Sequence, residues 1–336
     1  MTTTDTLPEA TQRVRRGNPF SSEGSRLSFG AAAAVLTALA VIYIAGGKDG
    51  ALVTQYVVTG LLMGGVYALV SLGLTLIFGV LGIVNFAQGA MLTMSMYLVY
   101  FMVSSWGINL YVAVLLTVPV MFGFGWAIQS VLLNRLAADA GHERPLLVTL
   151  GLSLLIGNVL LMIFGGRPQS LTAPVEGSIQ IFGAIADLPR IIAFAGAVLV
   201  AAALTLVLKK SPMGLAIRAV ASNGTGAALV GVNVRKIYAV TFGLGAASVA
   251  VAGGLLTPFT SLVPSAGEQF TTLAFVIVVL GGLGSIRGAF IGGVFIGLLQ
   301  TVGSLYLPGS GSLLLVFGMF VLILFLRPQG LFGAKQ

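Results

Sequence analysis

Ten long apolar stretches, none of which contains a charged side chain, divide the amino-acid sequence. About 20 apolar residues are enough to cross the hydrocarbon core of a bilayer as a helix. Only 8% of the whole chain is charged, which is too little for a protein whose surface faces water. We therefore predict an all-α, polytopic transmembrane bundle. Its candidate spans are residues 29–45, 54–80, 87–105, 110–133, 146–165, 191–208, 237–257, 270–284, 288–306 and 312–326.

Short glycine-rich interruptions separate two pairs of neighbouring stretches, around 82–89 and around 281–288. A bundle with helices broken in this way has between eight and ten spans, counted from the candidate stretches. Residues 1–28 lack the apolar surface that folding needs, so we predict a disordered, basic cytoplasmic tail. The run at 29–45 could belong to a signal peptide, but the spans that follow favour an uncleaved first helix. Residues 29–333 are then one transmembrane domain.

The positive charges indicate how the chain is oriented. Thirteen of the 17 Lys and Arg residues fall in the tail, in 134–145, in the long loop 209–236 and after the last stretch. The intervening segments hold only Lys48, Arg167 and Arg190, and Arg287 lies in a glycine-rich interruption. Because cytoplasmic segments of membrane proteins are enriched in Lys and Arg, we predict that both termini are cytoplasmic. The net charge of +8 is thereby explained without a nucleic-acid partner.

The negative charges suggest where the energy for any transport comes from. All nine carboxylates fall in predicted tails or loops: Asp5, Glu9, Glu23, Asp49, Asp139, Glu143, Glu176, Asp187 and Glu268. An ion-coupled carrier usually keeps an ionisable group at membrane depth. We therefore expect an energy source outside this chain.

Catalytic and metal-binding constellations are not expected. The chain has no cysteine, and its one histidine, His142, sits in a charged loop beside Glu143 and Arg144. Lys48 follows two glycines but precedes Asp49, whereas a phosphate-binding loop needs Ser or Thr there. We predict no catalytic residue, no metal site and no cofactor bound by this chain.

The long basic loop 209–236 contains signals for two short helices. Ser211 and Pro212 are suited to the N-cap and first position of a helix over 213–222. Asn223 and Gly224 would end it, Thr225 could cap a second helix, and Gly231 could end that one. The loop is either held at the surface by anionic lipid or docks onto a cytoplasmic ATPase. Coupling to an ATPase would involve Pro212, Gly214, Arg218, Ala219 and Gly231.

The two interruptions are candidates for a transport pathway. The first runs from Gly82 to Gly89, and the second contains Gly282, Gly284 and Gly288. Each alone could serve only close helix packing, but a pair of broken helices in two halves of a chain points to a transport site. Irregular backbone at membrane depth is tolerated where it lines a cavity.

These segments resemble the H-type (LivH-type) permease subunits of branched-chain amino-acid ABC importers. The resemblance runs from about residue 53 to the C-terminus. It rests on Gly60 to Leu69, Gly82 to Gly89, Pro212 to Gly231, Gly281 to Gly293 and Phe325 to Gly333. It implies an inner-membrane location, a second permease of the M type, two cytoplasmic ATPases that bind ATP and Mg²⁺, and an extracytoplasmic solute-binding protein. It also favours the coupling interpretation of 209–236.

The sequence departs from the family pattern at the first interruption. Many relatives read Asn-Phe-Ala-His-Gly-Glu there, whereas this chain has Gln88 and Ala90. The expected cargo is leucine, isoleucine and valine, and the alternatives within the family are urea, amides and aromatic or other carboxylates. An ion-coupled carrier and a passive channel remain further alternatives. The predicted pathway residues are Tyr67, Asn85, Gln88 and Ser285.

Overall fold

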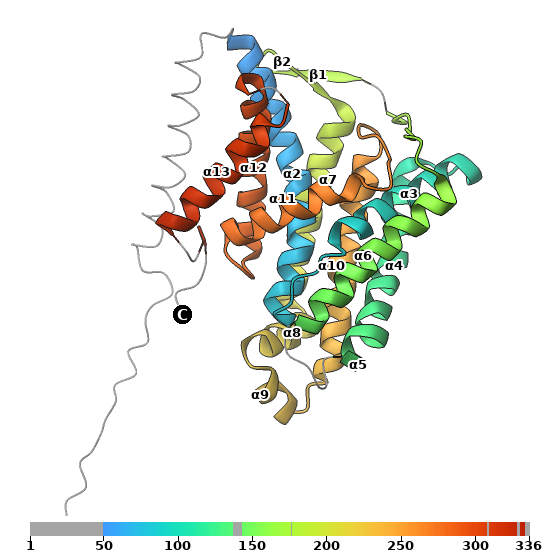
Figure 1. Ribbon diagram of the computed structural model, residues 1–336, viewed down its shortest axis with the longest axis vertical. Coiled ribbons are helices and arrows are strands. Elements are labelled where there is room, and N and C mark those ends of the chain that lie inside the picture. Colours follow the sequence, from blue (N-terminus) through green and yellow to red (C-terminus); the bar gives the residue numbers. More distant parts are fainter. Residues whose placement is uncertain (1–49, 137–142, 176, 308, 328–329, 333–336) are drawn as a thin grey trace, which may run out of the picture. The chain divides into compact units, whose positions relative to one another are not determined.

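The computed structural model describes residues 50–136, 143–175, 177–307, 309–327 and 330–332. The predicted tail, the predicted span 29–45 and His142 lie outside these residues. The helices of the described part are shown in Figure 1. They are α2 (Gly50–Leu81), α3 (Gln88–Trp106), α4 (Leu110–Ala127), the π-helix η1 (Ile128–Leu133), α5 (Asn134–Leu136), α6 (Glu143–Phe164), α7 (Leu188–Lys210), α8 (Pro212–Ser222), α9 (Gly224–Leu229), α10 (Val234–Leu256), α11 (Ala266–Gly281), α12 (Ile286–Tyr306) and α13 (Gly311–Leu326).

Each apolar stretch predicted after residue 50 forms a helix, which confirms the all-α, polytopic fold class. Within the described part, six helices are long and apolar enough to cross a membrane: α2, α4 with η1, α6 from Arg144, α7, α10 and α12. The helices α11 and α13 are apolar but shorter. The prediction of eight to ten spans therefore stays a prediction.

A two-stranded β-hairpin between α6 and α7 was not predicted. Its strands β1 (Ser178–Ile181) and β2 (Ala184–Asp187) are antiparallel. Phe182 and Gly183 form the turn with positive φ angles of 52° and 82°, as a tight two-residue hairpin requires. The side chain of Gln55 bonds both the N–H and the carbonyl of Ile185 at 2.7 Å. This pairing attaches the hairpin to the first turns of α2.

Helix α2 is the centre of the bundle, in contact with α7, α10, α11 and α12. Its tightest crossing is with α12, where Gly60 and Gly64 face Gly293 and Gly297. A Cβ atom on Gly64 would lie 2.6 Å from the Cα of Val294. Small residues four apart on both helices let the two backbones touch, which is how helices associate in lipid.

The basic loop and the hairpin lie at opposite ends of the bundle (Figure 1). Helices α8 and α9 share their end with α5, since the Asn134 amide donates to the Arg235 carbonyl at the start of α10. Arg190, beside β2, lies at the hairpin end, where it pairs with Asp187 at 3.3 Å. The positive charges of 209–236 are therefore gathered at one end, as the orientation prediction requires; the orientation itself stays a prediction.

The α2–α12 crossing generates the first testable prediction. Replacing Gly293 by Ala would press a methyl group against the backbone of Ala68, which cannot move aside as a side chain could. We expect Gly293→Ala to destabilise the protein by about 1–3 kcal/mol and to lower its thermal unfolding midpoint in detergent. Gly318→Ala on α13 is the matched control, because a Cβ there meets nothing within 4 Å. Equal midpoints for the two variants would contradict the packing argument.

Candidate functional site

The first interruption carries the chain back into the bundle. Helix α2 ends at Leu81, and Gly82 turns the backbone with a φ of 69°. Six residues later, the Gln88 side-chain amide donates to the carbonyl of Val70 at 3.1 Å. Val70 lies 11 residues before the end of α2, which is about 16 Å of helix. Helix α3 therefore begins deep inside the protein.

Asn85 and Gln88 hold this interruption together. Both side chains are fully buried. Asn85 Nδ2 donates to Gln88 Oε1 at 3.2 Å, and Asn85 Oδ1 accepts from the Ala87 N–H at 3.1 Å. These bonds satisfy polar groups that would otherwise be costly to bury. The two predicted pathway residues are thus brought together, with their polar atoms turned toward the protein.

The other two predicted pathway residues lie in different places. Tyr67 is buried on α2, three residues before Val70, and its ring meets Phe270 of α11 edge-on with centroids 5.9 Å apart. Ser285 is at the second interruption, where its Oγ accepts from the Gly288 N–H at 3.1 Å and caps α12. The structure therefore places Tyr67 near the first interruption and Ser285 at the second.

The second interruption lies against the last turn of α2, just before the first interruption. Gly282 and Gly284 have φ angles of 95° and 82°, which L side chains rarely adopt. A Cβ on Gly79, near the end of α2, would lie 3.0 Å from the Cα of Gly284. Gly288 is needed for a different reason, because a Cβ atom there would collide with the carbonyl of Gly281.

Residues near the C-terminus complete the second interruption. The N–H of Leu331 donates to the Leu280 carbonyl at 2.7 Å, and that of Phe332 to the Gly281 carbonyl at 3.2 Å. The last carbonyls of a helix have no partner within it. The segment 330–332 therefore supplies the partners that the end of α11 lacks.

The N-terminal turns of α3 and α11 form a reciprocal clasp of Gly89, Thr93, Gly267 and Thr271. The Gly89 N–H donates to Thr271 Oγ1 at 2.9 Å, and the Gly267 N–H donates to Thr93 Oγ1 at 2.8 Å. Each threonine hydroxyl also donates, at 3.2 Å, to the glycine carbonyl of its own helix. A Cβ on either glycine would collide with the carbonyl of the other. This clasp was not predicted from the sequence, although Gly-x-x-x-Thr occurs at both places.

A cavity of about 330 Å³ lies beside the clasp, between α3, α6 and α11. Among the described residues, Glu268 is the one charged residue on its wall. The lining residues are Phe86, Ala90, Thr93, Leu150, Ser153, Leu154, Gly157, Pro264, Gly267, Glu268, Thr271, Thr272 and Phe275. Asn85 and Gln88 do not line it, but their neighbours Phe86 and Ala90 do.

The start of α11 corrects the expectation that all carboxylates lie in tails or loops. Glu268 does not lie in a loop but in the first turn of α11, which begins four residues before the predicted apolar stretch. The clasp explains the early start, because it holds Gly267 in the bundle and keeps Glu268 with it. Glu143 likewise begins α6, and Asp187 ends β2.

The basic loop folds as two capped helices. Ser211 Oγ accepts from the Gly214 N–H at 2.9 Å, as predicted for α8. The second helix is capped by Asn223, whose Oδ1 accepts from the Gly226 N–H at 2.8 Å. The predicted cap at Thr225 is therefore wrong, because Asn223 ends one helix and starts the next. Gly231 follows α9 with a φ of 88°.

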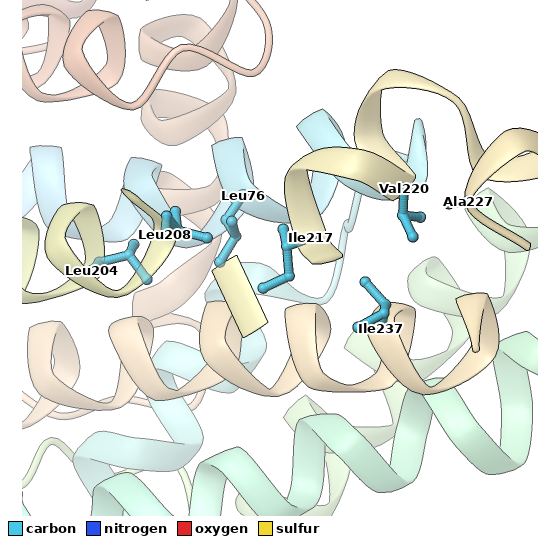
Figure 2. Packing of buried hydrophobic residues seen from close by; sticks show 7 residues of the cluster. All are labelled: Leu76, Leu204, Leu208, Ile217, Val220, Ala227 and Ile237. Carbon is cyan, nitrogen blue, oxygen red and sulfur yellow. The ribbon is translucent and has the colours of Figure 1, made fainter. Parts of the chain in front are cut away.

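A cluster of buried apolar side chains joins these two helices to the bundle (Figure 2). Its members are Leu76, Leu204, Leu208, Ile217, Val220, Ala227 and Ile237. Val80 and Ile286 pack against the cluster from the edges of the two interruptions. The cluster therefore packs α8 and α9 against α2, α7 and α10.

The predicted coupling residues divide into two groups. Gly214 is buried against the backbone of Val207 and Leu208, so it serves the packing of α8 on α7. Pro212, Arg218 and Gly231 are exposed, and Ala219 is half-buried. The exposed side of this region also presents Leu229 and Val230, which are 85% and 80% exposed.

The clasp generates a second testable prediction. Thr93→Val and Thr271→Val each keep the shape of the side chain but leave a buried glycine N–H on the facing helix without an acceptor. We expect each to destabilise the protein by about 1–3 kcal/mol, measured as a lower unfolding midpoint. Thr205→Val is the control, because the Thr205 hydroxyl donates to the Ala201 carbonyl of its own helix. A control that lost as much stability as the two clasp variants would contradict the role of the clasp.

Comparison with known proteins adds to these observations. Residues 56–325 match the family described as branched-chain amino acid transport system, permease component. The chain is 31% identical to the high-affinity branched-chain amino acid transport system permease protein LivH of Escherichia coli, over 84% of this chain and 96% of that protein. It is 30% identical to the permease protein BraD of Pseudomonas aeruginosa, with the same coverage.

A more distant similarity extends to another cargo. The ribose import permease protein RbsC of Bacillus subtilis is 29% identical over 76% of this chain and 79% of that protein. No solved structure matches the chain. The match over most of the sequence, with the six long apolar helices, makes this a multi-pass protein of the inner membrane. The chain belongs to the family of branched-chain amino acid transport permeases.

Proposed function

We propose that this permease imports leucine, isoleucine and valine, driven by ATP hydrolysis in partner subunits. The observation that carries the proposal is the similarity to LivH and BraD over 96% of their length, since both are named for branched-chain amino acid transport. The match to a ribose permease shows that related chains carry a different cargo, so the substrate needs its own test. Urea, amides and carboxylates are the alternatives within the family.

The proposed partners are an M-type permease, two ATP-binding subunits and an extracytoplasmic solute-binding protein. Helix α6 is the proposed contact for the second permease, because it borders the cavity. A second permease packed on α6 would close the cavity between the two chains. ATP and Mg²⁺ belong to the ATPases in this proposal, and this chain performs no catalysis.

The proposed coupling element is the pair α8 and α9. Their inner faces pack in the buried cluster, and their outer face presents Arg218, Leu229 and Val230. Exposed apolar side chains beside a positive charge suit a groove on another protein better than they suit water. Closure of the ATPases would push these helices, and the cluster would pass the movement to the two interruptions.

An ion-coupled carrier is the alternative to ATP-driven import. Glu268 is compatible with it, because a carboxylate on the cavity wall could bind a proton or a cation. Dissipating the proton gradient while ATP stays high discriminates between the two energy sources. Uptake that persists supports ATP-driven import, and uptake that stops favours the carrier. Flux through the permease alone in liposomes would favour the passive channel.

Uptake in the native host tests the cargo. We expect cells without this gene to lose uptake of labelled leucine that isoleucine and valine compete for, and to regain it with the gene on a plasmid. Urea and benzoate should not compete. Competition by urea or benzoate in place of isoleucine and valine would assign the permease to another cargo of the family.

Co-purification tests the coupling element. Leu229→Glu puts a charge on a side chain that touches little of its own protein, so folding should be retained. We expect this variant to lose at least nine-tenths of the ATPase subunits that co-purify with the wild-type permease, because burying an unpaired charge in an interface is costly. Phe182→Glu, at the exposed hairpin tip of the opposite end, is the control. Full retention of the ATPases by Leu229→Glu would remove α9 from the contact.

A further inference from the structure

The two ends of the clasp are equivalent positions in two similarly packed halves of the chain. Gly89 and Thr93 of α3 correspond to Gly267 and Thr271 of α11, bond for bond. The surrounding helices repeat the relation, because α4 packs on α10 as α12 packs on α2. The residue after each clasp glycine is therefore also equivalent. These residues are Ala90 and Glu268, and both line the cavity.

The negative charge of Glu268 has no positively charged residue near it on the described wall of the cavity. No Lys or Arg is among the lining residues, and within the described part of the chain the carboxylate of Glu268 makes no ion pair. Most of the remaining wall is apolar, with Phe86, Leu150, Leu154 and Phe275 contributing the largest side chains. The Glu268 side chain is exposed, so its carboxylate is open to a ligand that enters the cavity. A cationic group that displaced water there would form a charge-assisted hydrogen bond with it.

We propose that Glu268 binds the α-ammonium group of the amino acid as it passes through the permease. The assignment rests on the proposed function and specifies which residue recognises the transported amino acid. A cavity of about 330 Å³ is at the small end of the range for small-molecule sites, about 300–1,000 Å³, which suits a single amino acid. The leucine side chain would lie on the apolar wall. A lone negative charge also disfavours anions such as benzoate, which would meet like charge.

The symmetry of the clasp gives the carboxylate an alternative position. Ala90 and Glu268 line one cavity from equivalent positions, and the second of them is the carboxylate. A carboxylate at position 90 would present the same negative charge to the substrate from a different helix.

The test uses the complete transporter in liposomes, with the binding protein and leucine outside and ATP inside. The quantity measured is leucine taken up per ATP hydrolysed, because damage to assembly lowers both amounts together. We expect Glu268→Gln to lower this ratio at least tenfold. Asp187→Asn is the matched control, since it makes the same chemical change in a surface ion pair outside the cavity and should keep the wild-type ratio.

A second variant tests the equivalence of the two positions. Adding Ala90→Glu to Glu268→Gln restores the carboxylate from the other helix, and we expect the ratio to return to within threefold of the wild type. An unchanged ratio in Glu268→Gln, while the wild type imports leucine, overturns the role of Glu268 alone. A lowered ratio that Ala90→Glu leaves lowered overturns the equivalence. No leucine uptake by the wild type overturns the proposed function, and this assignment with it.

Discussion

Direct contact between helix backbones is the constraint on which the rest of this structure depends. In lipid, apolar side chains gain little by leaving the solvent, so helices associate through close packing and hydrogen bonds. Gly64 and Gly293 place α12 against α2, and Gly125 places α4 against α10 in the corresponding way. The helices α3 and α11 also meet backbone to backbone, at the contact of Gly89 with Gly267 in their first turns.

Helices that begin inside the protein must satisfy their first N–H groups there, because no water is available at that depth. The clasp does so for Gly89 and Gly267 with threonine hydroxyls, and Asn85 does so for Ala87. The same bonds fix the wall of the cavity. A pathway residue in such a place is also a structural residue, so transport assays of Asn85 variants need a parallel measurement of stability.

The sequence predicts the helices after residue 50 well, because an uncharged apolar run has few alternatives in a membrane. It also predicts the two interruptions and the first capped helix of the basic loop, since glycine, proline and serine act locally. It does not predict which helices meet, because contacts such as Thr93 with Gly267 span 174 residues. The hairpin was missed because β1 and β2 are only four residues each. Glu268 was placed in a loop because its helix starts where a distant contact, not local sequence, holds it.

The equivalence of Ala90 and Glu268 changes how sequence variation among such permeases should be interpreted. A property of the cavity that either half can supply is not preserved at any single alignment column. The carboxylate could disappear from one position in some lineages and arise at the other without loss of function. Selection would then preserve one carboxylate at either of two positions 178 residues apart. Each position examined alone would look freely variable. Covariation between the two halves of one chain would reveal that constraint.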